Sequence, residues 1–254
     1  MLCLKGKAAV VTGGSGTIGK AISKQLLKAG CNVHITGRNE QRLVEAKTEL
    51  MEFLDGQKDT GKVSTFAGDV TNQEDVINLF DTVGKSNAGG VDLLVNNAGI
   101  MAPGTSEELA AEDFSRVMEV NVLGPFLCAR EAMKRMKAKD EQGGRIINIG
   151  SISAIATRGH GAPYTTSKFA ILGLTHSLHV DAREYDISVG IIHPGNVLSG
   201  FLTPELAEER GRTEGFVAAD EVATCVYTMA SMPYSTNVWE LTVMPNKQAL
   251  LGRG

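Results

Sequence analysis

The residues T-G-G-S-G-T-I-G-K, from Thr12 to Lys20, follow a short apolar run and precede the helix-forming segment Ile18–Leu27. A loop between a strand and a helix must turn sharply, and glycines permit both the turn and the close approach of backbone N–H groups to an anion. The N-terminus of the following helix adds partial positive charge, which favours phosphate. The stretch therefore predicts a phosphate-binding loop in an α/β fold, although a glycine cluster alone also suits an ordinary turn.

Strand-length apolar runs and helix-length amphipathic segments alternate from this loop nearly to the end of the chain. The predicted strands are Ala8–Val11, Asn32–Thr36, Val63–Ala67, Val91–Asn96, Arg145–Ile149, Ser188–His193 and Glu240–Met244. The predicted helices between them include Lys20–Ala29, Gln41–Leu54, Gln73–Val83 and Val222–Met232. The strands are short and alternate poorly, which is typical of parallel strands covered on both faces. This rhythm predicts a doubly wound, Rossmann-like parallel sheet of about seven strands with right-handed crossovers.

The same rhythm predicts how the chain is organised. No Pro- or Ser-rich linker and no internal repeat interrupts it, so residues 1–254 are expected to form a single nucleotide-binding domain that includes the active site. The polar stretch Asp55–Lys62 is expected to be a solvated loop. The irregular stretch Ser199–Gly215 follows a strand end, where open α/β sheets bind ligands. It has two interpretations, a mobile lid over the substrate and a plain surface connection.

Composition excludes several classes of protein. The chain of 254 residues is 43% hydrophobic and carries a net charge of −4, so charge gives no support to nucleic-acid binding. No apolar run reaches the ~18 residues that a membrane span needs. The four cysteines form no C-x-x-C pair, which favours a reduced, cytoplasmic protein. His176 and His179 lie three apart without further ligands, so no metal site is predicted.

A second motif, Y-T-T-S-K, joins Tyr164 and Lys168 on a predicted helix. Positions i and i+4 share one helix face, so the phenol and the ammonium can reach the same site. A phenol with a pKa near ~10 is a poor base at neutral pH, but a nearby cation stabilises the phenolate and makes Tyr usable as an acid and base. A surface Tyr and Lys four residues apart are also common, so this motif needs support from elsewhere in the chain.

That support comes from V-D-L-L-V-N-N-A-G-I at Val91–Ile100, which ends a predicted strand in N-N-A-G. With the glycine loop and Y-x-x-x-K, it resembles the short-chain dehydrogenase/reductase family over nearly the whole chain, specifically the shorter branch of about this length. That branch usually reads T-G-x-x-x-G-x-G, whereas this chain has Thr17 and places the glycine at Gly16. The spacing is similar to that of longer members, many of which are epimerases or dehydratases acting on nucleotide sugars.

The resemblance implies a hydride exchange between NAD(P)(H) and a carbonyl/alcohol substrate. In its terms Tyr164 exchanges the proton, and Lys168 lowers the tyrosine pKa and holds the nicotinamide ribose. Ser151 orients the substrate oxygen, with Ser153 as a competitor that lies two positions late. Asn121 holds the water of a proton relay. A small-molecule substrate is implied, but its identity stays open.

The resemblance also assigns a set of cofactor contacts. The residues predicted to bind the cofactor are Gly13, Ser15, Gly16, Thr17, Ile18, Gly19, Arg38, Asp69, Val70, Asn97, Ala98, Gly99, Tyr164, Lys168, Pro194, Gly195 and Val197. Asp69 suits an Asx turn equally well. Homo-oligomers, tetramers or dimers, are implied through helices near Glu112–Lys137 and Tyr164–Tyr185, and closed symmetry is the usual state of soluble oligomers.

The end of the second predicted strand indicates which cofactor is preferred. A carboxylate there would bind the adenosine ribose hydroxyls and repel a 2′-phosphate. This strand ends instead in Gly37 and Arg38, and a guanidinium pairs well with phosphate, so NADP(H) is the predicted cofactor and NAD(H) remains possible. Glu40 offers another path to the ribose, although it also suits the start of the next helix. A non-catalytic protein that binds NAD(P) as a redox sensor or scaffold is the second function class.

Overall fold

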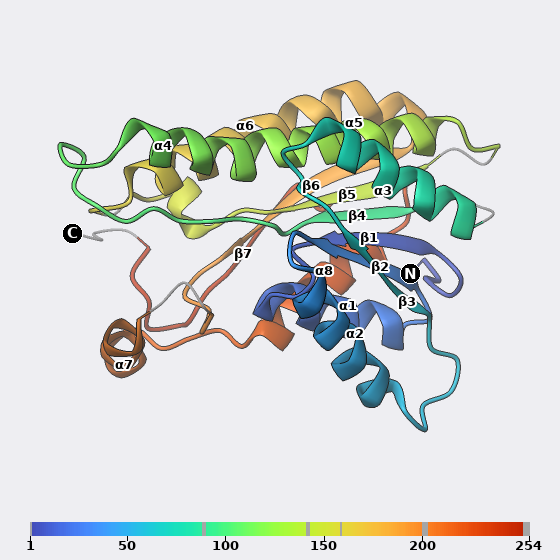
Figure 1. The fold of residues 1–254 in the computed structure, drawn as a ribbon, viewed down its shortest axis with the longest axis horizontal. Coiled ribbons are helices and arrows are strands. Elements are labelled where there is room, and N and C mark those ends of the chain that lie inside the picture. Colours follow the sequence, from blue (N-terminus) through green and yellow to red (C-terminus); the bar gives the residue numbers. More distant parts are fainter. Residues whose placement is uncertain (1, 88–89, 141–142, 158, 200–202, 251–254) are drawn as a thin grey trace.

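Figure 1 shows the computed structural model, in which helices cover both faces of a twisted parallel sheet. The structure describes residues 2–87, 90–140, 143–157, 159–199 and 203–250. The strands are β1 (Ala8–Thr12), β2 (Asn32–Gly37), β3 (Val63–Ala67), β4 (Leu93–Asn96), β5 (Gly144–Ile149), β6 (Ile187–Pro194) and β7 (Glu240–Val243). The α-helices are α1 (Thr17–Lys28), α2 (Glu40–Leu54), α3 (Gln73–Ser86), α4 (Ala111–Met118), α5 (Gly124–Lys137), α6 (Ala162–Ala182), α7 (Pro204–Thr213) and α8 (Ala219–Ala230). Shorter helical turns are η1 (Glu119–Leu123), η2 (Ile152–Ala154) and η3 (Arg183–Tyr185).

The order of the strands creates the place for a ligand. The sheet runs β3-β2-β1-β4-β5-β6-β7, and all neighbouring strands are parallel. The winding reverses between β1 and β4, so the loops that leave these two strands diverge and open a crevice at the carboxyl edge. The predicted fold class is confirmed, and each predicted strand is present with small shifts at its ends, such as β4 beginning at Leu93 rather than Val91.

Two apolar layers hold the helices to the sheet. Val11 belongs to the cluster shared with α1, α2 and α8, whereas its neighbour Val10 belongs to the cluster shared with α3, α5 and α6. Both side chains are 0% exposed, because consecutive residues of a strand point to opposite faces and both faces are covered. Figure 1 shows α3, α4, α5 and α6 on one side and α1, α2 and α8 on the other. None of the helices in the described ranges has the length and apolar character required to span a bilayer.

Several helix boundaries differ from the sequence prediction. Helix α1 begins at Thr17 rather than Lys20, because the loop glycine before it serves as the N-cap residue. Helix α8 begins at Ala219 and ends before Met232, the predicted last residue. Helix α1 therefore begins directly after the glycine loop, where its N-terminus can bind a ligand.

The region between β6 and α8 was expected to be irregular, and this expectation was wrong for most of its length. Helix α7 forms there because Thr203 caps it, accepting a hydrogen bond from the backbone N–H of Leu206 at 3.3 Å, and Pro204 suits the first helical turn. Residues 200–202 of the stretch Ser199–Gly215, interpreted from the sequence as a lid or a surface connection, lie outside the described residues. In Figure 1, α7 lies apart from the two helical layers, across from α4.

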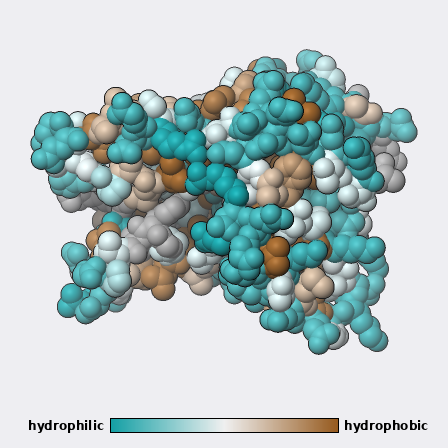
Figure 2. Space-filling model, viewed as in Figure 1, coloured by the Kyte–Doolittle hydropathy of each residue, from teal (hydrophilic) through white to brown (hydrophobic). Residues whose placement is uncertain are grey.

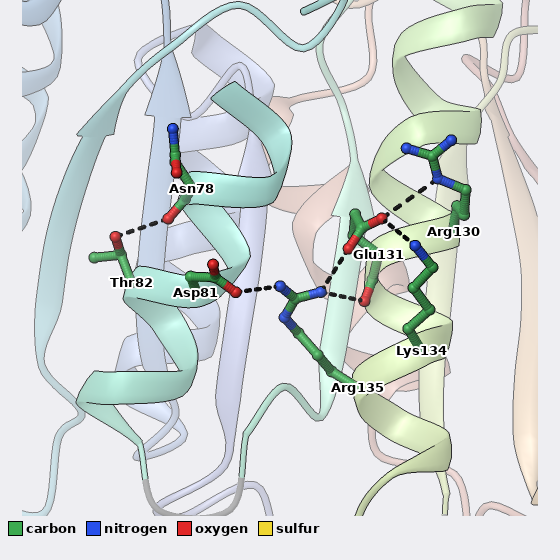
Figure 3. A network of polar contacts seen from close by, with 7 residues as sticks. All are labelled: Asn78, Asp81, Thr82, Arg130, Glu131, Lys134 and Arg135. Atoms are coloured by element: carbon green, nitrogen blue, oxygen red, sulfur yellow. Dashed lines mark hydrogen bonds and ion pairs between the residues drawn. The ribbon is translucent and has the colours of Figure 1, made fainter. Parts of the chain in front are cut away.

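Three basic residues of α5, Arg130, Lys134 and Arg135, are paired with acids (Figure 3). Glu131 is 3% exposed and accepts hydrogen bonds from Lys134 Nζ at 2.8 Å and from Arg135 at 2.7 Å. Arg135 also reaches Asp81 of α3 at 2.5 Å, which links the two helices. Burial alone would raise the pKa of Glu131, but the bonds from Lys134 and Arg135 hold it below its ordinary value. Because acids neutralise these basic side chains, this part of α5 gives no support to a nucleic-acid-binding surface.

Candidate active site

A cavity of about 920 Å3 lies along the carboxyl edge of the sheet. Residues at the ends of β1, β2, β3, β4, β5 and β6, or in the loops after them, form most of its lining, and residues of neighbouring helices such as Tyr164 and Lys168 of α6 complete it. Figure 2 shows a mostly hydrophilic face, on which hydrophobic residues gather between α4 and α7. The volume and the mixed lining are typical of a small-molecule or cofactor site.

Two positions of the glycine loop, Gly13 and Gly19, cannot accept a side chain without strain or collision. Gly13 has φ +63°, and a Cβ there would lie 2.9 Å from the Cα of Ala98. A Cβ at Gly19 would collide with the carbonyl oxygen of Gly13. Gly16 has φ −82° and would meet only the Gly13 carbonyl, at 3.3 Å, so the backbone does not demand glycine there. The unusual spacing therefore leaves the loop intact and lets α1 begin at Thr17.

The N-N-A-G segment locks this loop in place. Asn97 donates from its side chain to the backbone oxygens of Thr12 at 2.9 Å and Gly13 at 3.1 Å. Thr12 in turn accepts hydrogen bonds at Oγ1 from the backbone N–H groups of Asn97 and Ala98, both at 3.0 Å. The strand end β4 thereby fixes the loop after β1. The close backbone approach, the exposed start of α1 and the length of the cavity fit a dinucleotide with its phosphates at this helix N-terminus.

Basic side chains lie at the end of the cavity beyond β2. Arg38 lines it together with Gly37, and Arg42 from the first turns of α2 joins them. Arg42, in the first turn of α2, was missed by the sequence prediction. Asn39 caps α2 by accepting from the backbone N–H of Arg42 at 2.9 Å. Glu40 lies in the first turn of α2 and is not among the residues that line the cavity.

Asp69 also lines the cavity, and it forms the Asx turn that the sequence allowed. Its Oδ1 accepts from the backbone N–H of Thr71 at 2.9 Å and from the Thr71 hydroxyl at 2.8 Å. Its Oδ2 accepts from Arg116 of α4 at 3.3 Å, a partner that the sequence did not reveal. Burial would raise the pKa of Asp69, but these bonds hold it below its ordinary value. The carboxylate is therefore ionised and oriented before any ligand binds.

Tyr164 and Lys168 face the middle of the cavity from α6. The ammonium nitrogen of Lys168 lies 5.3 Å from the centre of the Tyr164 ring and donates to the backbone oxygen of Ile149 at 2.8 Å. Burial lowers the pKa of Lys168 to about 8. Ser151, at the end of β5, lines the same part of the cavity, and its Oγ accepts a hydrogen bond from the backbone N–H of Ser153 at 3.1 Å. The structure thus brings Ser151, Tyr164 and Lys168 together in one cavity.

Asn121 lies behind the cavity rather than on its wall. It belongs to η1, a π-helical turn between α4 and α5, instead of the regular helix that the sequence indicated. Its side chain accepts from the backbone N–H of Ile100 at 2.8 Å and donates to the Ile100 oxygen at 2.9 Å and to Ser167 Oγ at 3.0 Å. Such turns are common at functional sites, and this one holds the loop after β4 next to α6.

Most of the predicted site residues share this one cavity. Those that line it are Gly13, Ser15, Gly16, Thr17, Ile18, Arg38, Asp69, Val70, Asn97, Ala98, Gly99, Ser151, Tyr164, Lys168, Pro194, Gly195 and Val197. Gly19 and Asn121 do not, because both are packed behind the surface of the cavity. Lining residues that were not predicted from the sequence include Ile100, Met101, Val120 and Ile152, whereas Arg210 lies in the stretch Ser199–Gly215 that follows a strand end where a ligand is expected.

The fold and the cavity together indicate a class of enzyme. A cradle that fits a dinucleotide opens onto a Tyr–Lys pair and a serine, which is the arrangement expected of an oxidoreductase that uses a nicotinamide cofactor. Among the described residues, no group of three or more His, Cys, Asp or Glu is placed to hold a metal ion.

Comparisons with known proteins agree with this class. Residues 7–210 match the family described as short chain dehydrogenase. The 3-oxoacyl-[acyl-carrier-protein] reductase FabG of Rickettsia bellii is 35% identical over 210 residues, which cover 83% of this chain and 80% of that protein. The 3beta-hydroxysteroid dehydrogenase 2 of Eggerthella lenta is 33% identical over 226 residues, 87% of this chain and 84% of that protein. An alcohol dehydrogenase from the archaeon Thermococcus sibiricus, solved with 5-hydroxy-NADP, has a TM-score of 0.82 and 27% identity, covering 96% of this chain and 98% of that chain.

The chain belongs to the short-chain dehydrogenase/reductase family. Proteins of this family bind NAD or NADP, and this one is an oxidoreductase that transfers a hydride at a CH–OH or C=O group. The predicted reaction class is confirmed. Neither a non-catalytic binding protein nor a nucleotide-sugar epimerase is favoured by these relatives.

Proposed function

We propose that this enzyme is an NADP(H)-preferring dehydrogenase/reductase in which Tyr164 is the general acid and base. The observation that carries the proposal is the single cavity shared by the glycine loop, Arg38 and the pair of Tyr164 and Lys168. In that cavity the ammonium of Lys168 lies 5.3 Å from the centre of the tyrosine ring. The bound cofactor supplies the hydride, and the protein supplies placement and electrostatics.

Each polar residue has a role that its contacts support. Tyr164 gives a proton to the substrate oxygen during reduction and removes it during oxidation. The Lys168 ammonium stabilises the phenolate and, being buried, acts with little screening by water. The Oγ of Ser151 already accepts from Ser153, so its own hydrogen is left to polarise the substrate oxygen. Asn121 holds the loop after β4 against α6 and supports the relay that reprotonates the tyrosine.

The charges around the adenosine end support the preference for NADP(H). Arg38 and Arg42 both line this end, and among the described residues neither forms an ion pair with an acid. A guanidinium pairs with phosphate through charge-assisted hydrogen bonds. Glu40, the residue that could bind ribose hydroxyls instead, starts α2 and is absent from the lining. The 2′-phosphate is therefore expected between Arg38 and Arg42.

A double substitution tests this preference. Gly37→Asp with Arg38→Leu should shift the ratio of kcat/KM for NADP(H) over NAD(H) by about 10²-fold toward NAD(H), because a cation is lost and a repelling carboxylate is gained. A Cβ at Gly37 would meet Leu43 at 3.8 Å and Ser15 at 3.9 Å, so the new side chain fits. The matched control, Glu40→Gln, should leave the ratio unchanged. A clear advantage for NAD(H) in the unsubstituted enzyme would overturn the proposal.

The substrate is a small carbonyl or alcohol compound whose scaffold the cavity does not name. Ile100, Met101 and Ile152 give the wall beside Tyr164 an apolar character, and Arg210 of α7 adds a cation. A panel of acyl, steroid, sugar and simple alcohol substrates, followed at the nicotinamide absorbance in both directions, would identify the class. If none of these substrates is turned over, the proposed role of this cavity as the active site is contradicted.

We also propose a homodimer or homotetramer that uses the face of α4, α5 and α6. Large apolar side chains are exposed on this face: Phe114, Leu123, Phe126, Phe169 and Val180. A second copy would cover them, and a closed two-fold assembly is the usual arrangement.

Light scattering tests the assembly. The enzyme should be a dimer or tetramer at micromolar concentration, and Phe126→Lys with Phe169→Lys should produce a smaller species, because charges would be buried at the interface. Val44→Lys, at an equally exposed apolar position on α2, is the control and should not change the mass. A monomeric unsubstituted enzyme would contradict the proposal.

A cytoplasmic location is proposed on the basis of the cysteines. All four are free thiols: Cys3, Cys31, Cys128 and Cys225. Burial raises the pKa values of Cys31 and Cys128 to about 12, which makes them inert core residues rather than reactive groups. A chain without disulfides suits a reducing compartment.

A further inference from the structure

His193 is a buried titratable residue that the mechanism above does not use. It lies in β6, directly before Pro194, and its side chain is 0% exposed. It is not among the residues that line the cavity. Its Nδ1 instead lies 3.0 Å from the backbone oxygen of Ser151.

This contact determines which nitrogen of the imidazole carries the hydrogen. A carbonyl oxygen can only accept, so Nδ1 is the donor, and in the neutral ring Nε2 is bare. Nε2 is buried and has no hydrogen-bond partner among the described residues. The nearest acidic oxygen, Oε2 of Glu240, lies 3.8 Å away, while Oε1 of Glu240 pairs with His176 at 2.9 Å. His176 itself is stacked on Trp239, with ring centroids 4.4 Å apart.

Gly150, directly after β5, leaves the space that the contact between His193 and the Ser151 carbonyl requires. A Cβ at Gly150 would lie 2.7 Å from Nδ1 of His193, so glycine is needed for the imidazole to reach the Ser151 carbonyl. The backbone N–H of Gly150 donates to the Ile192 oxygen at 2.7 Å. The backbone oxygen of Ile149, the residue before Gly150, accepts a hydrogen bond from Lys168 Nζ. Both carbonyl groups that flank Gly150 are therefore held by side chains from other elements.

We propose that His193 is a positioning residue that holds Ser151 in the orientation needed to polarise the substrate oxygen. The inference rests on the proposed role of Ser151. The bond to the Ser151 carbonyl restrains the peptide that carries the side chain, while the bond from Ser153 N–H restrains Oγ. With both restrained, the hydroxyl hydrogen of Ser151 is the one free to face the cavity.

The imidazole acts in its neutral form. The groups that face it are Glu240 on β7, Lys168 and His176 on α6, and the Ser151 carbonyl. Burial holds the pKa of His193 below its ordinary value, although the Ser151 carbonyl and Glu240 oppose this effect. A neutral ring avoids placing a second cation beside Lys168, so any replacement that keeps the function must be uncharged and must donate at the Nδ1 position.

Two substitutions separate the hydrogen bond from the volume of the side chain. His193→Leu fills the space without a donor, and it should lower kcat by about tenfold while the dissociation constant of the cofactor stays within twofold. His193→Asn places an amide N–H where Nδ1 stands and should restore kcat to within about threefold of the unsubstituted enzyme. If the leucine variant does not fold, His193→Gln replaces it, since its donor lies at the Nε2 position and cannot reach the carbonyl.

A double-mutant cycle with Ser151→Ala decides whether His193 acts through the serine. Ser151→Ala alone should lower kcat strongly, and adding His193→Leu should cause no further decrease, because the group being positioned is gone. An equal decrease in both backgrounds, or failure of His193→Asn to restore activity in a folded protein, would overturn the inference. Full activity of Ser151→Ala alone would instead overturn the proposed role of Ser151, so the two failures are distinguishable.

Discussion

Replacing Tyr164 with Phe should lower kcat by about 10³-fold and leave cofactor affinity within twofold, because in the proposed mechanism the phenol hydrogen is the proton exchanged with substrate. The ring remains to pack beside Lys168, whose ammonium lies 5.3 Å from its centre. The loss is therefore chemical rather than structural. Phe offers no group that can donate or accept the proton at this place.

The measurement is steady-state turnover on the substrate found by screening, with cofactor binding followed separately by nicotinamide fluorescence. Tyr185→Phe is the matched control, since that ring lies in η3, stacks against Lys137 with Nζ 3.8 Å from its centre, and is absent from the cavity lining. It should retain full activity. Near-normal turnover by the Tyr164 variant would remove the tyrosine from the mechanism.

Replacing Lys168 with Met should lower kcat by about 10²-fold or more and also weaken cofactor binding, because in the proposed mechanism one ammonium stabilises the phenolate and binds the nicotinamide ribose. The same substitution should stabilise the protein without cofactor at neutral pH. Burial lowers the pKa of Lys168 from 10.5 to about 8, so the native state holds this charge at a cost on the order of 3 kcal/mol. Met removes the charge, although the bond to the Ile149 oxygen is lost with it.

The stability advantage of the Met variant should depend on pH. Below pH 8 the lysine is protonated in both the native and the unfolded state, and the full cost is present. Between about pH 8 and 10.5 only the unfolded chain keeps the proton, so the stability of the unsubstituted protein rises with pH and the advantage of Met fades. Thermal unfolding of both proteins across this range tests it. A Met variant that is less stable at pH 7, or an advantage that persists above pH 10.5, would contradict the explanation.

The sequence by itself determined the elements of the fold. Runs such as Val91–Asn96 are apolar without alternation because the strand is covered on both faces, and this local pattern is readable without any knowledge of the partners. The same holds for Tyr164 and Lys168, since four residues along a helix bring side chains to one face whatever surrounds them. The glycine loop is equally local, and its altered spacing proved harmless because Gly16 has an ordinary φ.

Only the tertiary structure decided which other side chains reach the site. Arg116 meets Asp69 across 47 positions of sequence, and His193 meets Ser151 across 42. These contacts arise because parallel strands place their carboxyl ends at one edge, and no periodicity along the chain reports which side chains then touch. The π-helical turn at Asn121 was likewise invisible, since it depends on how the neighbouring helices pack rather than on the propensity of its own residues. Helix α7 was missed for a different reason, because its signals, the Thr203 cap and Pro204, are local and were not used.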